Sequence, residues 1–223
     1  MLIKICPSMM CADFSNLKEE VEKLELAGAD MFHIDVMDGK YVPNFALGPQ
    51  DIKALKSLAT IPLDVHLMIE NPEKYIELFA KLGCDIIYVH PESTTHIHRT
   101  LLQIKAAGKK AGVALNPGTS LAVLDEILND LNYIMLMAVN PGFAGQDFIP
   151  ETIDKAKRLK RDILKNNKYK DIKIAIDGSI NTKNIPLLFD AGAELFVAGT
   201  SGLFKNGQTY KESIDELKKS ISK

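Results

Sequence analysis

Eight short apolar runs recur along the chain, and amphipathic stretches with helical periodicity separate them. The runs cover residues 3–8, 31–37, 62–68, 85–91, 111–117, 133–141, 172–178 and 195–201. Regular alternation of strand and helix predicts parallel strands joined by right-handed crossovers. Eight such units within 223 residues predict a (β/α)8 TIM barrel of the α/β class, near the lower end of the size range for that fold.

A doubly wound open sheet is the alternative fold, but it needs fewer strands and no Gly-x-Gly-x-x-Gly sequence follows the first run. No linker-like or low-complexity stretch divides the chain, so we expect residues 1–223 to form one domain. A hydrophobic fraction of 46% and a charged fraction of 25% are normal for a globular protein of this kind.

Charge and hydropathy argue against two classes of partner. A net charge of -2 provides no basic surface for a nucleic acid, and no apolar run approaches the roughly 18 residues of a membrane span. The first residues are broken by Pro7 and Asp13 and do not resemble a signal peptide. Cys6, Cys11 and Cys84 are odd in number and lack CxxC spacing, which indicates reduced thiols and a cytoplasmic protein.

Polar residues on one face of otherwise apolar runs point to a functional site. Alternation with a period of two places the even-numbered apolar residues of 31–37 against the helices, and His33 and Asp35 inside the barrel. The same reasoning turns His66 and Asp177 inward in the third and seventh runs. Because active sites of such barrels lie at the C-terminal ends of the strands, these four side chains should meet there.

Carboxylates buried in this way are costly unless something compensates their charge, and a divalent cation is the simplest compensation. Two imidazole nitrogens and two carboxylate oxygens suit Zn²⁺, Fe²⁺, Mn²⁺ or Co²⁺, with Mg²⁺ the less favoured choice. A hydrogen-bonded structural network without a metal is the alternative. The sequence therefore predicts one divalent metal ion at His33, Asp35, His66 and Asp177.

Glycine-rich turns follow the sixth, seventh and eighth runs, at residues 140–146, 177–179 and 199–202. Glycine lets backbone N–H groups approach an anion closely, and phosphates commonly bind at these turns in barrels. We therefore expect a phosphorylated ligand. Met37, Met68 and Met137 lie near strand ends, where they either pack the core or form an uncharged shield around a reactive site.

Four motifs, "HIDVMDGKYVPN", "DVHLMIENPEKYI", "NPGFAGQDFIPET" and "IDGSIN", resemble the ribulose-phosphate 3-epimerase family, with similarity running from Ile5 to about Phe204. The resemblance implies that Asp35 and Asp177 form an acid/base pair on opposite faces of a ketose phosphate, and that the same two residues bind the metal with His33 and His66. It also implies a homo-oligomer.

Further roles follow from the same resemblance. Ser8 and His66 would contact the sugar, and residues 39–44 would close over the site. The residues implied to hold the substrate, mainly its phosphate, are Gly142, Phe143, Ala144, Gly145, Asp177, Gly178, Ser179, Gly199 and Thr200.

The implied activity is metal-dependent 3-epimerisation of a ketose phosphate by two-aspartate proton transfer through a metal-stabilised enediolate. Ala144, Ser179 and the "GTSGLF" turn resemble the D-allulose-6-phosphate 3-epimerases, so we expect conversion of D-allulose 6-phosphate to D-fructose 6-phosphate. The alternative is conversion of D-ribulose 5-phosphate to D-xylulose 5-phosphate.

Two other functions fit the residues less well. A Schiff-base aldolase needs an inward lysine near a strand's C-terminal end, whereas Lys173 lies at the start of its run. A sugar-phosphate binding protein without turnover would have no need of both Asp35 and Asp177.

Overall fold

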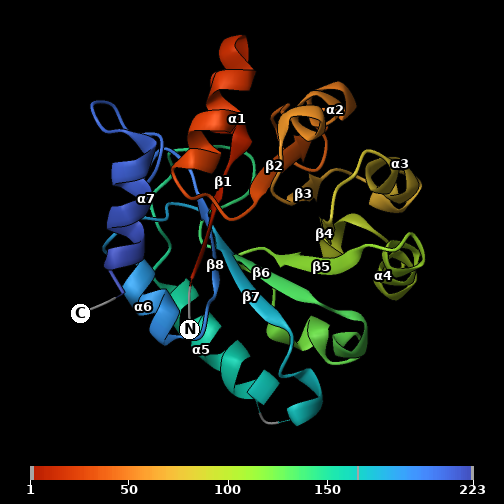
Figure 1. Ribbon diagram of the computed structural model, residues 1–223. Helices are drawn as coiled ribbons and strands as arrows, with labels where there is room; N and C mark the ends of the chain where they lie inside the picture. The colour runs from red at the N-terminus through yellow and green to blue at the C-terminus, as the bar shows by residue number, and fades with distance from the viewer. Residues whose placement is uncertain (1–2, 165, 222–223) are drawn as a thin grey trace.

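Eight parallel strands pair in the order β1-β8-β7-β6-β5-β4-β3-β2, with helices around them (Figure 1). The computed structural model describes residues 3–164 and 166–221. A parallel bridge between Ser8 and His33 joins the two ends of the sheet and brings the barrel close to full closure. The predicted (β/α)8 barrel is therefore confirmed. Its strands are β1 (Lys4–Pro7), β2 (Phe32–Met37), β3 (Leu63–Met68), β4 (Ile86–Val89), β5 (Lys110–Leu115), β6 (Tyr133–Met137), β7 (Lys173–Asp177) and β8 (Leu195–Ala198).

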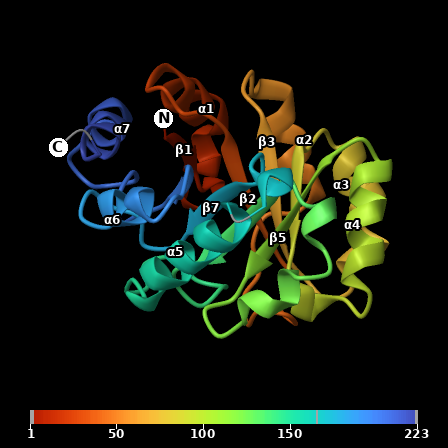
Figure 2. The same ribbon diagram turned by 90° about the horizontal axis from the view of Figure 1, so that it is seen from below.

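The helices lie outside the strands, with α3 and α4 on one side of the barrel and α5, α6 and α7 on the other (Figure 2). Local sequence explains where several of them begin. Pro49 opens α2, and the backbone N–H of Gly48 donates to the Asp51 carboxylate at 2.8 Å. Thr209 and Glu212 form a capping box at the start of α7. The helices are α1 (Leu17–Leu26), α2 (Pro49–Leu58), α3 (Ile76–Lys81), α4 (Ile97–Ala106), α5 (Glu151–Leu164), α6 (Ile185–Asp190) and α7 (Tyr210–Lys219).

The connection between β5 and β6 differs from the expected pattern. All its residues are described, and it contains two 3₁₀ turns, Leu121–Leu124 and Leu128–Asp130, in place of an α-helix. Its apolar residues Leu121, Leu124 and Ile127 recur every three positions, the period at which 3₁₀ side chains share a face. All three pack on the main core, so the connection still covers the barrel.

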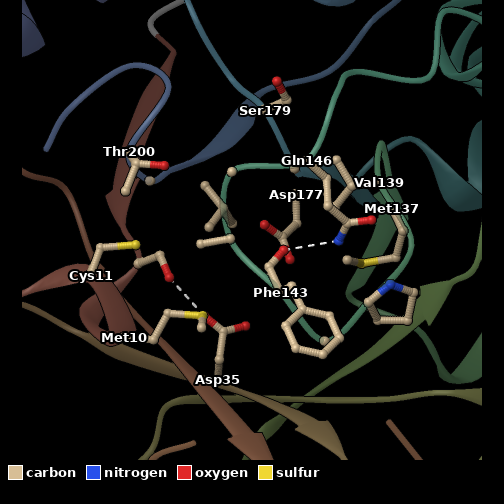
Figure 3. A pocket seen from close by; sticks show the side chains of 18 of the residues that line it. Met10, Cys11, Asp35, Met137, Val139, Phe143, Gln146, Asp177, Ser179 and Thr200 are labelled. Atoms are coloured by element: carbon tan, nitrogen blue, oxygen red, sulfur yellow. Dashed lines mark hydrogen bonds between the residues drawn. The ribbon is translucent and has the colours of Figure 1, made fainter. Parts of the chain in front are cut away.

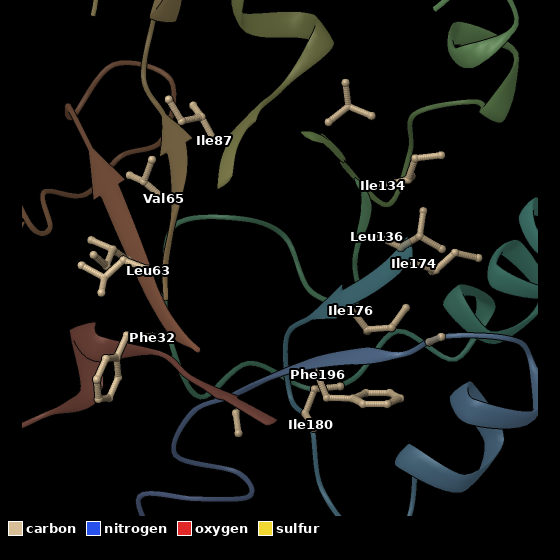
Figure 4. Close-up of a cluster of buried hydrophobic side chains, with 14 of the residues drawn as sticks. Phe32, Leu63, Val65, Ile87, Ile134, Leu136, Ile174, Ile176, Ile180 and Phe196 are labelled. Carbon is tan, nitrogen blue, oxygen red and sulfur yellow. The ribbon is translucent and has the colours of Figure 1, made fainter. Parts of the chain in front are cut away.

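Two apolar layers fill the molecule. The larger lies between strands and helices and contains alternate residues of each strand, such as Phe32, Val65, Ile176 and Phe196 (Figure 4). The smaller lies inside the barrel around Tyr88. Gly112 of β5 is required beside this ring, because a Cβ there would overlap it.

Several strands end earlier than predicted. The run 133–141 forms a strand only over Tyr133–Met137, and the run 85–91 only over Ile86–Val89. Pro141 and Pro91 lack the N–H that a ladder needs, so the chain leaves the sheet near them. The polar ends of these runs are thereby released into the loops at the barrel mouth.

The cysteines and the hydropathy of the helices also bear on the sequence predictions. Cys6 and Cys84 are buried in the two apolar layers, and no cysteine in the described part of the chain forms a disulfide. Among residues 3–164 and 166–221, no helix has the length and apolar content needed to cross a bilayer.

Candidate active site at the barrel mouth

The register of β2 and β3 places the polar side chains in layers. His33 lies beside Asp64, Asp35 beside His66, and Met37 beside Met68. All six side chains have the parity that points into the barrel, because their alternating neighbours pack against the helices. Strand β7 brings Asp177 to the same level, next to Met137 of β6.

The four residues predicted to bind a metal come together. His33, Asp35, His66 and Asp177 each offer one donor atom, and these four atoms lie within 4.8 Å of one another. Oδ1 of Asp35 lies 3.3 Å from Nε2 of His33 and 3.5 Å from Nδ1 of His66. Oδ2 of Asp177 lies 4.0 Å and 3.6 Å from the same two nitrogens.

The histidine nitrogens show that this cluster fits a cation. Nε2 of His33 and Nδ1 of His66 are buried and have no hydrogen-bond partner among the described residues. The other ring nitrogen of each is engaged: Nδ1 of His33 contacts the Asp64 carboxylate, and Nε2 of His66 lies 2.8 Å from Nε2 of His90. Each ring therefore directs a free nitrogen at the carboxylates, as metal-ligating histidines do.

The crowding of charged groups in this cluster shifts the pKa values of His33, His66 and Asp35. Burial disfavours the charged form of His33, but the Asp64 and Asp35 carboxylates outweigh it and hold the pKa of His33 well above its ordinary value. Burial likewise lowers the pKa of His66, but the nearby Asp177 and Asp35 carboxylates outweigh it and raise this pKa above its ordinary value. Burial also opposes ionisation of Asp35, yet His33 and His66 lower the pKa of this carboxyl.

A pocket opens above the cluster, and Asp35 and Asp177 reach it from different strands (Figure 3). Ser8 donates from Oγ to Oδ2 of Asp35 at 2.7 Å, which leaves Oδ1 for the donor cluster. His33 and His66 are fully buried behind the carboxylates and do not line the pocket. The other predicted residues all line it: Ser8, Asp35, Met37, Met68, Met137, Gly142, Phe143, Ala144, Gly145, Asp177, Gly178, Ser179, Gly199 and Thr200.

The turn after β7 has a constrained backbone. Gly178 has φ +116°, and a Cβ there would lie 2.8 Å from the backbone nitrogen of Val139. Ser179 follows with φ +53°, a left-handed conformation that is uncommon outside glycine. Asn181 and Asn184 donate from their amides to the Ser179 carbonyl at 3.1 Å and 2.7 Å, which holds this turn in place.

The loop after β2, residues 39–44, lies against loops from other strands. The amide of Asn44 donates to the Gly142 carbonyl at 2.8 Å, and the Tyr41 hydroxyl accepts from Asn116 at 2.8 Å. Asp38 accepts from the backbone of Lys40 and anchors the turn. The loop is thus attached to the glycine-rich turn after β6.

Some residues of the site were not assigned a role from the sequence. Asp64 has the same inward parity as His33 and His66, and that parity is the signal that could have identified it. His90 follows the last residue of β4 and is fully buried against His66. Gln146 donates to the Asn140 and Phe143 carbonyls and shapes the turn after β6, a contact that no sequence pattern indicates.

Lys173, considered for a Schiff base, lies at the N-terminal end of β7 and pairs with Glu194 at 2.8 Å. It is therefore at the opposite end of the barrel from the pocket.

Comparison with known proteins identifies the family. The profile of the Ribulose-phosphate 3 epimerase family matches residues 4–204. The chain is 46% identical over 217 residues to a ribulose-phosphate 3-epimerase of Bacillus subtilis, covering 97% of this chain and 99% of that one. It is 44% identical over 220 residues to that of Escherichia coli K12, covering 98% and 96%. The Synechocystis protein of the same name is 46% identical over 220 residues, covering 98% and 94%.

Solved structures of lower identity share only the fold. A 3-hexulose-6-phosphate synthase from Salmonella typhimurium superposes with a TM-score of 0.69 at 15% identity, covering 99% of both chains. KGPDC from Streptococcus mutans gives 0.70 at 13% identity, covering 100% of this chain and 98% of that one.

The preference for D-allulose 6-phosphate, drawn from Ala144, Ser179 and the turn 199–204, is not supported by the relatives. Proteins identical at nearly half of all positions are named for ribulose phosphate. A few residues in three turns are weaker indicators of substrate than similarity along the whole chain. The chain belongs to the ribulose-phosphate 3-epimerase family and is an isomerase, a carbohydrate-phosphate 3-epimerase.

Proposed function

We propose that this protein interconverts D-ribulose 5-phosphate and D-xylulose 5-phosphate by inverting C3, with one divalent metal ion bound at His33, Asp35, His66 and Asp177. The observation that carries the proposal is the donor cluster itself, in which two buried, unpartnered imidazole nitrogens face two carboxylates at the floor of a pocket. Relatives along the full chain support the five-carbon substrate.

Inversion at C3 requires removal of a proton from one face of the carbon and return of a proton to the other. Asp35 and Asp177 reach the pocket from β2 and β7, so they are placed to act from different sides of a bound sugar. One carboxylate takes the proton while the other gives one, and the roles exchange with the direction of reaction. A bound cation would supply Lewis-acid stabilisation of the negative charge that develops at the neighbouring ketone.

The remaining pocket residues orient the substrate and exclude water. Met37, Met68 and Met137 present uncharged thioethers around the carboxylates, which suits a site where a carbanionic species must not meet water. The turns at 142–145, 178–179 and 199–200 would bind the phosphate through backbone N–H groups, at the position usual for barrels. Binding energy from this non-reacting end then helps to position C3. Ser8 would contact the sugar while holding Asp35.

The proposal is tested by NMR in D₂O with metal-loaded protein. We expect solvent deuterium at C3 of D-ribulose 5-phosphate and formation of its 3-epimer. Absence of exchange with every ketose phosphate tried would refute the enzymatic proposal.

Substrate identity is tested separately by comparing kcat/KM for D-ribulose 5-phosphate and D-allulose 6-phosphate. We expect the pentulose to be preferred. A clear preference for the hexulose would instead support D-allulose 6-phosphate, the substrate expected from Ala144 and Ser179.

The cytoplasmic location and the homo-oligomer stay predictions. Free thiols in the described chain support the first, and light scattering on the purified protein would test the second.

A further inference from the structure

His90 lies directly behind one of the two histidines of the donor cluster. It follows the last residue of β4, two positions after Tyr88, which pairs with His66 in the sheet. Its side chain is fully buried. Its Nε2 is 2.8 Å from Nε2 of His66, and the two ring centroids are 4.9 Å apart.

The position of the proton between these nitrogens is decided by the opposite side of His66. A hydrogen bond between two imidazole nitrogens needs one protonated and one unprotonated nitrogen. If His66 accepted, its own proton would lie on Nδ1 and point at Asp35 and Asp177, where a cation needs a lone pair. Cation binding therefore requires that His66 donate from Nε2 and that His90 accept at Nε2.

The surroundings of His90 favour the same arrangement. A neutral His90 that accepts at Nε2 carries its proton on Nδ1. Its Nδ1 is buried without a hydrogen-bond partner among the described residues, and the nearest carboxylate oxygen, Oε2 of Glu92, is 3.8 Å away. An N–H pointing toward a carboxylate is favourable, whereas a lone pair in the same place would be repelled. The Tyr41 ring covers His90 with a centroid separation of 4.9 Å.

We propose that His90 is a positioning residue that accepts the Nε2–H of His66 and so fixes the tautomer in which Nδ1 of His66 can bind the metal. This inference rests on the metal-dependent function proposed above. The same role on the other side of the site falls to Asp64, a charged acceptor for His33. The two histidines thus differ in donor strength, because a carboxylate increases the basicity of its imidazole more than a neutral ring does.

The direct test is the tautomer of His90 in zinc-loaded protein, read from ¹⁵N chemical shifts of labelled histidine. We expect protonation at Nδ1 and an unprotonated Nε2. A proton found on Nε2 of His90 would overturn the proposal.

The second test is metal affinity, measured by Co²⁺ titration against a chelator, with the visible spectrum reporting coordination. His90→Phe keeps a ring of similar size and removes the acceptor, so we expect about a 10- to 100-fold loss of affinity. His90→Gln places an amide oxygen near the former Nε2 and should recover most of that loss. His98→Gln, at an exposed histidine paired with Asp130, is the matched control and should bind like the parent.

The outcomes separate this inference from the proposed function. A parent protein that binds no divalent metal refutes the metal-dependent function. A parent that binds, together with His90→Phe and His90→Gln variants of unchanged affinity, refutes only the role of His90. Melting of the metal-free variants, compared with the parent, shows whether a loss of affinity comes from damage to the fold.

Discussion

Each histidine of the donor cluster has one nitrogen engaged by the protein and one left for a ligand. His33 is engaged by Asp64 and His66 by His90, and all four side chains are buried. Unpaired buried polar atoms usually cost about 1–3 kcal/mol each. Without a metal, the free nitrogens of His33 and His66 either stay unpaired or take up protons beside Asp35 and Asp177, whereas one bound cation would satisfy both nitrogens and both carboxylates.

Replacement of Asp177 by Asn should separate proton transfer from folding. The amide cannot take the C3 proton, so we expect epimerisation to fall by about 100- to 10,000-fold. Deuterium exchange should persist, if at all, for only one of the two epimers, because only Asp35 remains. Activity near the parent level would remove Asp177 from this role, and metal content measured in parallel controls for a lost ligand.

The pH dependence of metal binding follows from the raised pKa values of His33 and His66. Burial lowers both, but neighbouring carboxylates outweigh it, so both lie above the ordinary 6.5. The metal must displace these protons, so apparent affinity should keep rising as pH increases above 6.5. Co²⁺ titrations from about pH 6 to about pH 9 check this. A plateau already reached by about pH 7.5 would contradict it, because an unperturbed imidazole with a pKa of about 6.5 is almost fully deprotonated there.

At the scale of elements, the strands place the chemistry and the loops complete the pocket. The donor cluster belongs to β2, β3 and β7, whose register is fixed by hydrogen-bonded pairing. The glycine-rich turns after β6, β7 and β8 and the loop 39–44 depend instead on a few side-chain contacts and on special backbone conformations. Substitutions in these loops should therefore change substrate binding and the local opening of the loops more readily than they change the geometry of the donor cluster.

Gly178→Ala should be strongly destabilising. Its positive φ and the approach of Val139 both oppose a Cβ, so we expect a loss of about 2–5 kcal/mol in the free energy of unfolding. Gly108→Ala is the matched control: it also has positive φ but nothing lies within 4 Å of its Cβ, so only about 1–2 kcal/mol is expected. Urea unfolding of both variants measures the difference. Equal losses would show that the contact with Val139 is unimportant.

Asn44→Ala should detach the loop after β2 from the turn after β6. The lost hydrogen bond to the Gly142 carbonyl joins the two segments, so amide hydrogen exchange should quicken in both 39–45 and 141–146. Exchange in the β-strands should stay unchanged. Asn129→Ala, which removes an exposed hydrogen bond with Tyr169, is the control. Faster exchange in only one of the two segments would argue against their coupling.

At the scale of the whole molecule, closure of the barrel and construction of the site share residues. Ser8 bridges β1 to β2 beside His33 and also donates to Asp35. Below it, Asp30 accepts from the backbone of Ile5, and Lys218 of α7 pairs with Asp30 at 2.9 Å. Residues near both ends of the described chain therefore lie together where the sheet closes. A metal at the site would stabilise this closed barrel.

Metal binding should accordingly raise the melting temperature. A ligand at 100 times its Kd adds about 2.7 kcal/mol to the free energy of unfolding, which corresponds to roughly 5–11 °C for a domain of this size. Calorimetry with chelator and then with added Zn²⁺ or Co²⁺ measures the shift. His33→Gln should lose most of it. A parent protein whose melting temperature ignores added metal would contradict metal binding at the site.

Much of this protein was determined by the sequence alone. Eightfold alternation of strand and helix predicted the barrel, because hydrophobic periodicity is a local property. Parity within each run predicted that His33, Asp35, His66 and Asp177 would face inward at one end. Neither prediction requires knowledge of which strands pair in the barrel or of the register in which they pair.

The surroundings of those four residues depend on how distant parts of the chain pack together. The register of β3 with β2 and β4 sets Asp64 behind His33 and His90 behind His66, and register depends on contacts between segments far apart in sequence. The contact of Asn44 with Gly142 likewise joins segments far apart in sequence. The sequence thus identified the atoms that can bind a metal, whereas three-dimensional packing decided which of their lone pairs are free to do so.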